Sequence, residues 1–97
     1  RVAKVRIAGE ERFIAGEVVR KDNTGECAQG VLVTLEGAGT KQETRTDTFG
    51  DFEFEGLDKD TSYTIHIELA GYAPQALEVV TRRDVDLGEV VLEPAGR

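Results

Sequence analysis

The chain has no methionine or tryptophan, and its 97 residues include one cysteine, one histidine and two prolines. The single cysteine, Cys27, excludes a disulfide within the chain. It also excludes a self-contained zinc finger or iron–sulfur centre, since each of these needs several ligands. No apolar run approaches the roughly 20 residues that span a bilayer, and no N-terminal stretch has the order of a signal peptide. The chain begins at Arg1 rather than Met, and we expect it to be a piece of a larger protein.

Basic residues are also scarce, with twelve against nineteen acids and a net charge of −7. Phosphate backbones and anionic membrane surfaces repel an acidic domain. We therefore expect neither nucleic-acid binding nor membrane insertion. Hydrophobic residues make up 39% of the chain and are spread along it, which favours one folded domain of modest size over disorder.

The chain is rich in strict alternation between apolar and polar residues. Tyr63, Ile65 and Ile67 alternate with polar neighbours, and Phe52 and Phe54 do the same. This period of two is typical of strands with one face in a core and the other in water. The pattern predicts strands at about 13–20, 30–37, 41–47, 51–55, 62–70, 75–81 and 85–92, and an eighth at Val2–Ala8.

Glycine, asparagine and aspartate fall between these segments at short intervals, as in a β-sandwich or barrel. Gly88, near the middle of the last segment, predicts a bulge. Val85 and Leu87 would point inward before the bulge, and Val90 and Leu92 after it. We predict a core that contains Val18, Val33, Leu35, Phe52, Phe54, Ile65, Ile67 and Leu87.

Four short strings occur in a characteristic order: residues 16–18, residues 30–35, residues 46–54, and Gly71-Tyr72. Together they resemble the carboxypeptidase regulatory-like family, which is similar to transthyretin-like and Cna B-like domains. The resemblance implies an all-β fold: a seven- to eight-stranded antiparallel Greek-key β-sandwich, transthyretin- or prealbumin-like, that is not an enzyme by itself. It divides the chain into a lead-in edge strand or linker at 1–12, the sandwich at 13–93 and a frayed C-terminus at 94–97.

Three segments also look like the C-terminal extension of ferredoxin-type iron–sulfur subunits: residues 12–19, Glu26-Cys27 and residues 47–52. Those subunits partner molybdopterin oxidoreductases. The resemblance implies a bacterial accessory domain of an electron-transfer subunit, whose partner would be the preceding domain or a partner subunit. The cluster-binding cysteines are absent here, so no cofactor is expected in this chain. Compartment (cytoplasm, periplasm or extracellular) and oligomeric state stay open.

Few side chains are candidates for chemistry. His66 lies on the face of its strand opposite the apolar residues, so we expect its side chain to point to solvent. Ser62 is too near in sequence to act as its nucleophilic partner. Glu26 beside Cys27 should raise the pKa of the thiol, which argues against a reactive thiolate. We therefore expect no catalytic, cofactor-binding or metal-binding residue.

Acidic residues gather in three loops, but none has the spacing of an EF-hand calcium loop. The pattern indicates turn chemistry and solubility rather than a metal site. The loop residues are Asp22, Asn23 and Glu26, then Asp58 and Asp60, then Asp84 and Asp86.

The string Lys21-Asp22-Asn23-Thr24-Gly25 resembles the Cna B-type adhesin domains, which often carry a Lys–Asn isopeptide bond. On that resemblance, the lysine and acid positions of the bond fall on Val19 and Ile67. Both are apolar, so no isopeptide bond is expected.

Two functions follow as hypotheses. The first is a non-catalytic structural or interaction domain appended to a larger protein, and specifically to the iron–sulfur subunit of an oxidoreductase. The second is a protein- or carbohydrate-binding module of a secreted or cell-surface protein. Sugar-binding surfaces usually expose aromatic rings, and only Phe13 and Phe49 fall outside the core pattern, which counts against sugar.

Overall fold

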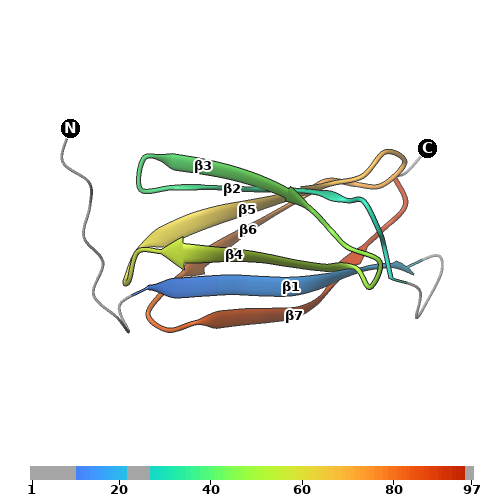
Figure 1. Ribbon diagram of the computed structural model, residues 1–97. Coiled ribbons are helices and arrows are strands. Elements are labelled where there is room, and N and C mark those ends of the chain that lie inside the picture. Colours follow the sequence, from blue (N-terminus) through green and yellow to red (C-terminus); the bar gives the residue numbers. More distant parts are fainter. Residues whose placement is uncertain (1–10, 22–26, 96–97) are drawn as a thin grey trace.

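The computed structural model describes residues 11–21 and 27–95, which form seven strands in two sheets packed face to face (Figure 1). One sheet has the order β4-β1-β7 and the other β3-β2-β5-β6. This confirms the all-β sandwich that the sequence predicts. The strands are β1 (Arg12–Arg20), β2 (Leu32–Gly37), β3 (Thr40–Arg45), β4 (Asp51–Leu57), β5 (Ser62–Glu68), β6 (Gln75–Val80) and β7 (Val85–Leu92).

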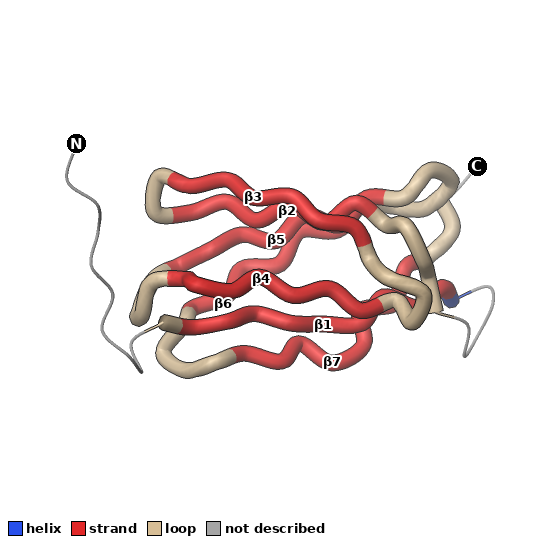
Figure 2. Tube along the Cα trace, viewed as in Figure 1, coloured by secondary structure: helices blue, strands red, loops and turns tan. Residues whose placement is uncertain are grey.

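The alternation in the sequence becomes the inside and outside of each sheet. In β5, Tyr63, Ile65 and Ile67 are buried and the residues between them are not. The turns gather at the two ends of the sandwich (Figure 2). None of the described residues belongs to a helix long and apolar enough to cross a membrane.

The boundaries of the predicted segments agree with those of the observed strands to within two residues. The predicted segment 41–47 ends early because Thr46 turns inward to bond a neighbouring loop. Pro94 and Ala95 of the predicted frayed end 94–97 have partners, because Pro94 pairs with Tyr72 and the Ala95 amide donates to the Gly71 carbonyl at 3.0 Å. Residues 96–97 lie outside the described residues. The predicted eighth strand, residues 2–8, lies outside the described residues.

One strand pair corrects the prediction of an antiparallel sandwich. β1 and β7 run parallel, with Ile14 opposite Val85 and Arg20 opposite Leu92. β6 belongs to the other sheet, so the chain crosses between the sheets before β7 and re-enters in the direction of β1. Side-chain alternation is the same in parallel and antiparallel strands and does not record direction.

The bulge predicted at Gly88 is present. Gly88 has a φ of 69°, its amide donates to Asp86 Oδ1 at 2.9 Å, and the β1–β7 register shifts at this level. Val90 is buried after the bulge, while Leu87 before it is partly buried and packs on the core. The other seven predicted core residues are buried, and Leu87 lies at the margin because β7 is the last strand of its sheet.

The core lies between the two sheets and includes a pair of phenyl rings. Phe52 and Phe54 have ring centroids 6.1 Å apart at a tilted angle of 59°, a favourable geometry for aromatic pairs. Gly16 on β1 makes room for them, because a Cβ there would lie 2.7 Å from Phe52 Cζ. The buried core residues are Ile14, Val18, Ala28, Val31, Val33, Leu35, Phe52, Phe54, Leu57, Tyr63, Ile65, Ile67, Val79, Val90 and Leu92.

Two buried threonines join loops to the sandwich. Thr46 Oγ1 donates to the Ala28 carbonyl at 2.6 Å and accepts from the Val31 amide at 2.9 Å. Thr81 Oγ1 donates to the Asp58 carbonyl at 2.6 Å and accepts from an amide of the same loop. Each hydroxyl therefore satisfies backbone groups that would otherwise be buried without a partner.

Phe54→Ala should lower the free energy of unfolding by about 3–5 kcal/mol, because it removes a ring from a closely packed core. Urea unfolding followed by circular dichroism would measure the loss. Phe49→Ala is the matched control, since the Phe49 side chain is 68% exposed and its loss should change stability by about 0.5 kcal/mol or less. Similar losses in both variants would contradict the core assignment.

Candidate functional site

The loop between β3 and β4 is held by one carboxylate and one glycine. Asp47 Oδ1 accepts from the Phe49 and Asp51 amides, each at 2.9 Å. Gly50 has a φ of 80°, and its carbonyl accepts from the Val18 amide at 2.8 Å. A Cβ at Gly50 would lie 2.5 Å from the Val18 carbonyl oxygen. Only glycine therefore allows the loop to approach β1 this closely.

A hollow of about 550 Å³ lies on the outer surface of the β4-β1-β7 sheet, next to this loop. Its polar lining is acidic because the outward positions of three neighbouring strands carry carboxylates. We call this surface the acidic face. Its members are Glu17 on β1, Asp51 and Glu53 on β4, Asp86 and Glu89 on β7, and Asp47 in the loop.

Desolvation and neighbouring carboxylates raise the pKa of two acidic side chains on this surface. The pKa of Asp51 is raised above 3.8 by desolvation and then by the charges of Asp47, Glu17 and Asp86. The pKa of Glu53 is raised above 4.5 by desolvation, and then by a hydrogen bond to Glu55 and its charge. Desolvation and neighbouring carboxylates therefore disfavour the ionised forms of Asp51 and Glu53 in the folded state.

Within residues 11–21 and 27–95, no three histidine, cysteine, aspartate or glutamate side chains are placed to hold a metal ion. Asp84 Oδ1 accepts from the Phe13 amide at 3.1 Å, and Asp86 Oδ1 accepts from the Gly88 amide. These two carboxylates therefore act as turn and strand-end acceptors. Asp22, Asn23 and Glu26 lie outside the described residues.

Cys27 lies beside β1, because it forms an isolated bridge with Val19. Its Sγ donates to Glu17 Oε2 at 3.3 Å. The pKa of the thiol is raised above 9.0 by that hydrogen bond first, then by desolvation and by the charges of Glu17, Asp51 and Glu89. The predicted direction is confirmed, but the carboxylate responsible here is Glu17. The predicted neighbour, Glu26, lies outside the described residues.

The structure does not bring His66 and Ser62 together. His66 Nε2 lies 3.5 Å from Glu36 Oε1, and Ser62 Oγ donates to Glu78 Oε2 at 3.3 Å. Four residues along one strand separate the two by about 13 Å. The His66 side chain is 39% exposed, so it points outward as predicted.

The structure also places the two positions aligned with an isopeptide bond and the two aromatic residues outside the core pattern. Val19 and Ile67 are buried, while Lys21 is exposed with its Nζ 3.8 Å from Glu93 Oε1. Phe13 and Phe49 are both exposed. They lie near opposite ends of the sandwich. Phe13 is the second residue of β1, whereas the loop that carries Phe49 contacts Val18, near the other end of β1. The two rings therefore form no common platform for a sugar.

Asp51→Asn should raise the free energy of unfolding at pH 7, because it removes a charge that the folded state disfavours. The pKa of Asp51 is higher in the folded state than its ordinary value of 3.8. Protonated Asp51 therefore makes its whole contribution to stability below pH 3.8, and this contribution is lost as pH rises through the pKa of the folded state. The gain from Asp51→Asn should therefore shrink as pH falls toward 3.8. Urea unfolding at a series of pH values from 7 downward measures the difference in free energy of unfolding between the variant and the parent.

Glu43→Gln on β3 is the control, because Glu43 lies outside the acidic face, and it should lack this pH-dependent gain. A difference between Asp51→Asn and the parent that stays constant at all pH values would contradict the prediction.

Glu17→Gln should speed alkylation of Cys27 by iodoacetamide at mildly alkaline pH. The substitution removes the carboxylate that raises the pKa of the thiol, so more reactive thiolate forms. Mass spectrometry of timed samples gives the rate, and Glu36→Gln on the other sheet is the control that should leave it unchanged. An equal rate in all three proteins would show that Glu17 does not control the thiol.

No curated protein matches the chain in sequence. Among solved structures, the Bacillus anthracis TIE protein superposes with a TM-score of 0.71 and 16% identity over 88% of this chain, which spans only 17% of that chain. Klebsiella pneumoniae 5-hydroxyisourate hydrolase gives 0.69 and 18% identity, covering 88% of this chain and 92% of that one. The C-terminal domain of shaft pilin spaA from Lactobacillus rhamnosus GG gives 0.65 and 12%, covering 88% and 98%.

At these identities the likeness shows the fold alone, and the same fold occurs in a hydrolase and in a pilin. The family model is more specific. The model of the carboxypeptidase regulatory-like domain matches residues 14–93, from the third residue of β1 to just beyond β7. The chain therefore belongs to the carboxypeptidase regulatory-like domain family, a family of non-catalytic modules.

Proposed function

We propose that this chain is a non-catalytic structural or interaction domain appended to a larger protein. The observation that carries the proposal is that the polar side chains of the domain form hydrogen bonds within the domain itself. The buried hydroxyls of Thr46 and Thr81 and the carboxylate of Asp47 all bond backbone groups of the domain's own loops. The phenol oxygen of Tyr63 likewise accepts from the Asp58 amide at 2.9 Å. These groups maintain the fold and do not converge on a reacting atom.

The remaining candidates for chemistry have partners that suit structure better than catalysis. A general base must lie within hydrogen-bond reach of the nucleophile whose proton it takes. Ser62 and His66 each face a different carboxylate. A thiol whose pKa is raised is a poor nucleophile at neutral pH, and the pKa of Cys27 is raised.

The parent we favour is the iron–sulfur electron-transfer subunit of an oxidoreductase. The support is the resemblance of residues 12–19 and 47–52 to the C-terminal extension of such subunits. These two strings are neighbours in space, since Glu17 pairs with Asp51 and the Val18 amide bonds the Gly50 carbonyl. The similar residues therefore form one continuous part of the β1–β4 surface. The partner would be the preceding domain or a partner subunit.

A protein-binding module of a secreted or cell-surface protein is the second candidate. It is favoured by the superposition on the shaft pilin domain, which covers 98% of that domain. A carbohydrate-binding role has less support, because Phe13 and Phe49 lie near opposite ends of the sandwich.

Deleting residues 13–93 from the full-length parent should weaken its association with its partner subunit or lower its thermal unfolding midpoint. Its active-site chemistry should persist, because the deleted domain supplies no reacting group. Co-purification, thermal unfolding and turnover of both proteins measure these effects. Unchanged association and unchanged stability would contradict an accessory role.

The reading frame of the parent separates the two candidates. Clusters of four cysteines upstream of Arg1 would support the iron–sulfur subunit. A signal peptide with a cell-wall anchor would support the surface module.

A further inference from the structure

The path of the chain places the start of β1 and the end of β7 at opposite ends of the sandwich. β1 begins at Arg12, and β7 lies beside it, runs parallel to it and ends at Leu92, opposite Arg20 (Figure 1). The nine residues of β1 span roughly 27 Å at about 3.3 Å per residue. A force that stretches the chain therefore pulls the start of β1 and the end of β7 apart along the direction of the strands.

Because β1 and β7 pair directly with each other, this force acts along their shared hydrogen-bond ladder. The pairing extends from Ile14 opposite Val85 to Arg20 opposite Leu92, with one shift of register. The hydrogen bonds of a parallel pair are evenly spaced along the two strands. A force along the strands loads many of these bonds together, whereas a force across the strands would break them one at a time from one end.

Buried side chains also oppose sliding of β1 against β7. Ile14 and Val18 on β1 belong to the same core as Val90 and Leu92 on β7. A closely packed interior has few voids, so these side chains cannot move past one another while the core stays intact. β1 also pairs with β4 along its other side, and both pairings must break before β1 can leave the sheet.

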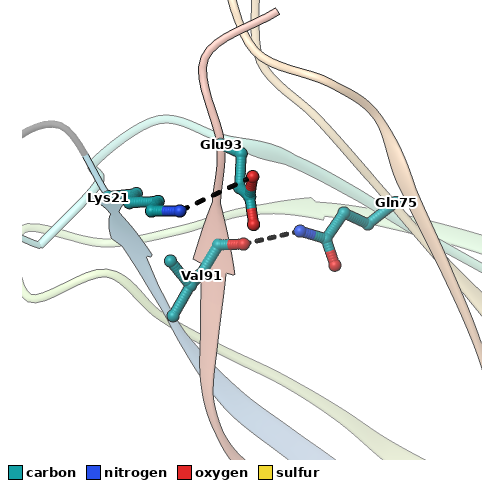
Figure 3. Close-up of polar contacts among 4 residues, drawn as sticks. All are labelled: Lys21, Gln75, Val91 and Glu93. Carbon is teal, nitrogen blue, oxygen red and sulfur yellow. Dashed lines mark hydrogen bonds and ion pairs between the residues drawn. The ribbon is translucent and has the colours of Figure 1, made fainter.

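Further contacts connect the end of β7 to both sheets. Gln75 Nε2 on β6 donates to the Val91 carbonyl on β7 at 2.6 Å (Figure 3). The Ala73 amide donates to the Glu93 carbonyl at 2.9 Å. Lys21, just after β1, has its Nζ 3.8 Å from Glu93 Oε1 (Figure 3). The end of β7 that a stretching force pulls is therefore bonded to the four-stranded sheet as well as to β1.

The start of β1 is connected in a similar way at the other end of the sandwich. The Phe13 amide donates to Asp84 Oδ1 at 3.1 Å, just before β7 begins. Arg12 is opposite Leu57 of β4. Both points at which a stretching force enters the sandwich are thus bonded to more than one neighbouring segment.

We propose that the domain acts as a tension-resistant link, in which the parallel pair of β1 and β7 resists a force that stretches the chain. The resistance comes from the direction of the force relative to the paired strands, and it needs neither a ligand nor a partner. It is a property of the domain itself and does not depend on which larger protein carries it. The property suits the second candidate function, because a module of a cell-surface protein is stretched between the cell and the surface that it contacts.

Single-molecule stretching of the complete 97-residue chain tests the inference. In one protein, the handles are attached at the two ends of the chain. In the matched control, they are attached through the side chains introduced by Lys59→Cys and Arg82→Cys, two exposed positions. Cys27→Ser is present in both proteins, so that no handle attaches there. Because Ser62 pairs with Val80 next to these positions, the control force separates β5 from β6 at one end of their antiparallel pair.

The unfolding force should be several-fold higher for end-to-end pulling than for the control at the same loading rate, because forced unfolding follows the barrier and not the equilibrium stability. One rupture should release the whole sandwich. Gln75→Ala should lower the end-to-end force, since it removes the bond to the Val91 carbonyl. Gln42→Ala on β3 is the control variant and should leave that force unchanged.

Three results would overturn the inference. Equal unfolding forces in the two pulling directions would show that the direction of the force has no effect. An early step at low force that releases only residues 85–92 would show that β7 separates from β1 without resistance. Equal forces in the parent, Gln75→Ala and Gln42→Ala would exclude the end of β7 from the resisting element. None of these results bears on the accessory role, which the deletion of residues 13–93 tests separately.

Discussion

The central position of β1 is the constraint on which the rest of the structure depends. This strand pairs with β4 on one side and with β7 on the other, so it joins the beginning, the middle and the end of the chain. Such pairings close long loops, and the entropy of closing them must be offset by the apolar surface that both sheets bury. The β3–β4 loop approaches β1 closely only because Gly50 has no side chain to meet the Val18 carbonyl.

The same arrangement creates the acidic face. Each of the three strands directs alternate residues outward, and parallel and antiparallel pairing around β1 brings their carboxylates side by side. Glu17, on the central strand, accepts from the Cys27 thiol and faces the charges of its neighbours. Desolvation is the largest cause of the raised pKa of Asp51, and the hydrogen bond to Glu17 is the largest cause of the raised pKa of Cys27. The charge of Glu17 contributes to both shifts, and neither shift requires a catalytic explanation.

Membership of the carboxypeptidase regulatory-like family agrees with a domain whose polar groups maintain loops. The solved structures that superpose on it include a hydrolase and a pilin, so the sandwich by itself does not specify a function. The acidic face is a feature of the surface of this chain, and β1, β4, β7 and the β3–β4 loop all contribute carboxylates to it.

The strands, their inward faces, the turns between them and the bulge at Gly88 were predictable from the sequence. These features are local, because side-chain alternation and a positive φ are properties of a few consecutive residues. Tertiary structure alone decided the parallel pairing of β1 with β7, the contact between Cys27 and Glu17, and the burial of Thr46 and Thr81. Each of these depends on which strands become neighbours across long separations in sequence, and no local pattern of residues records that choice.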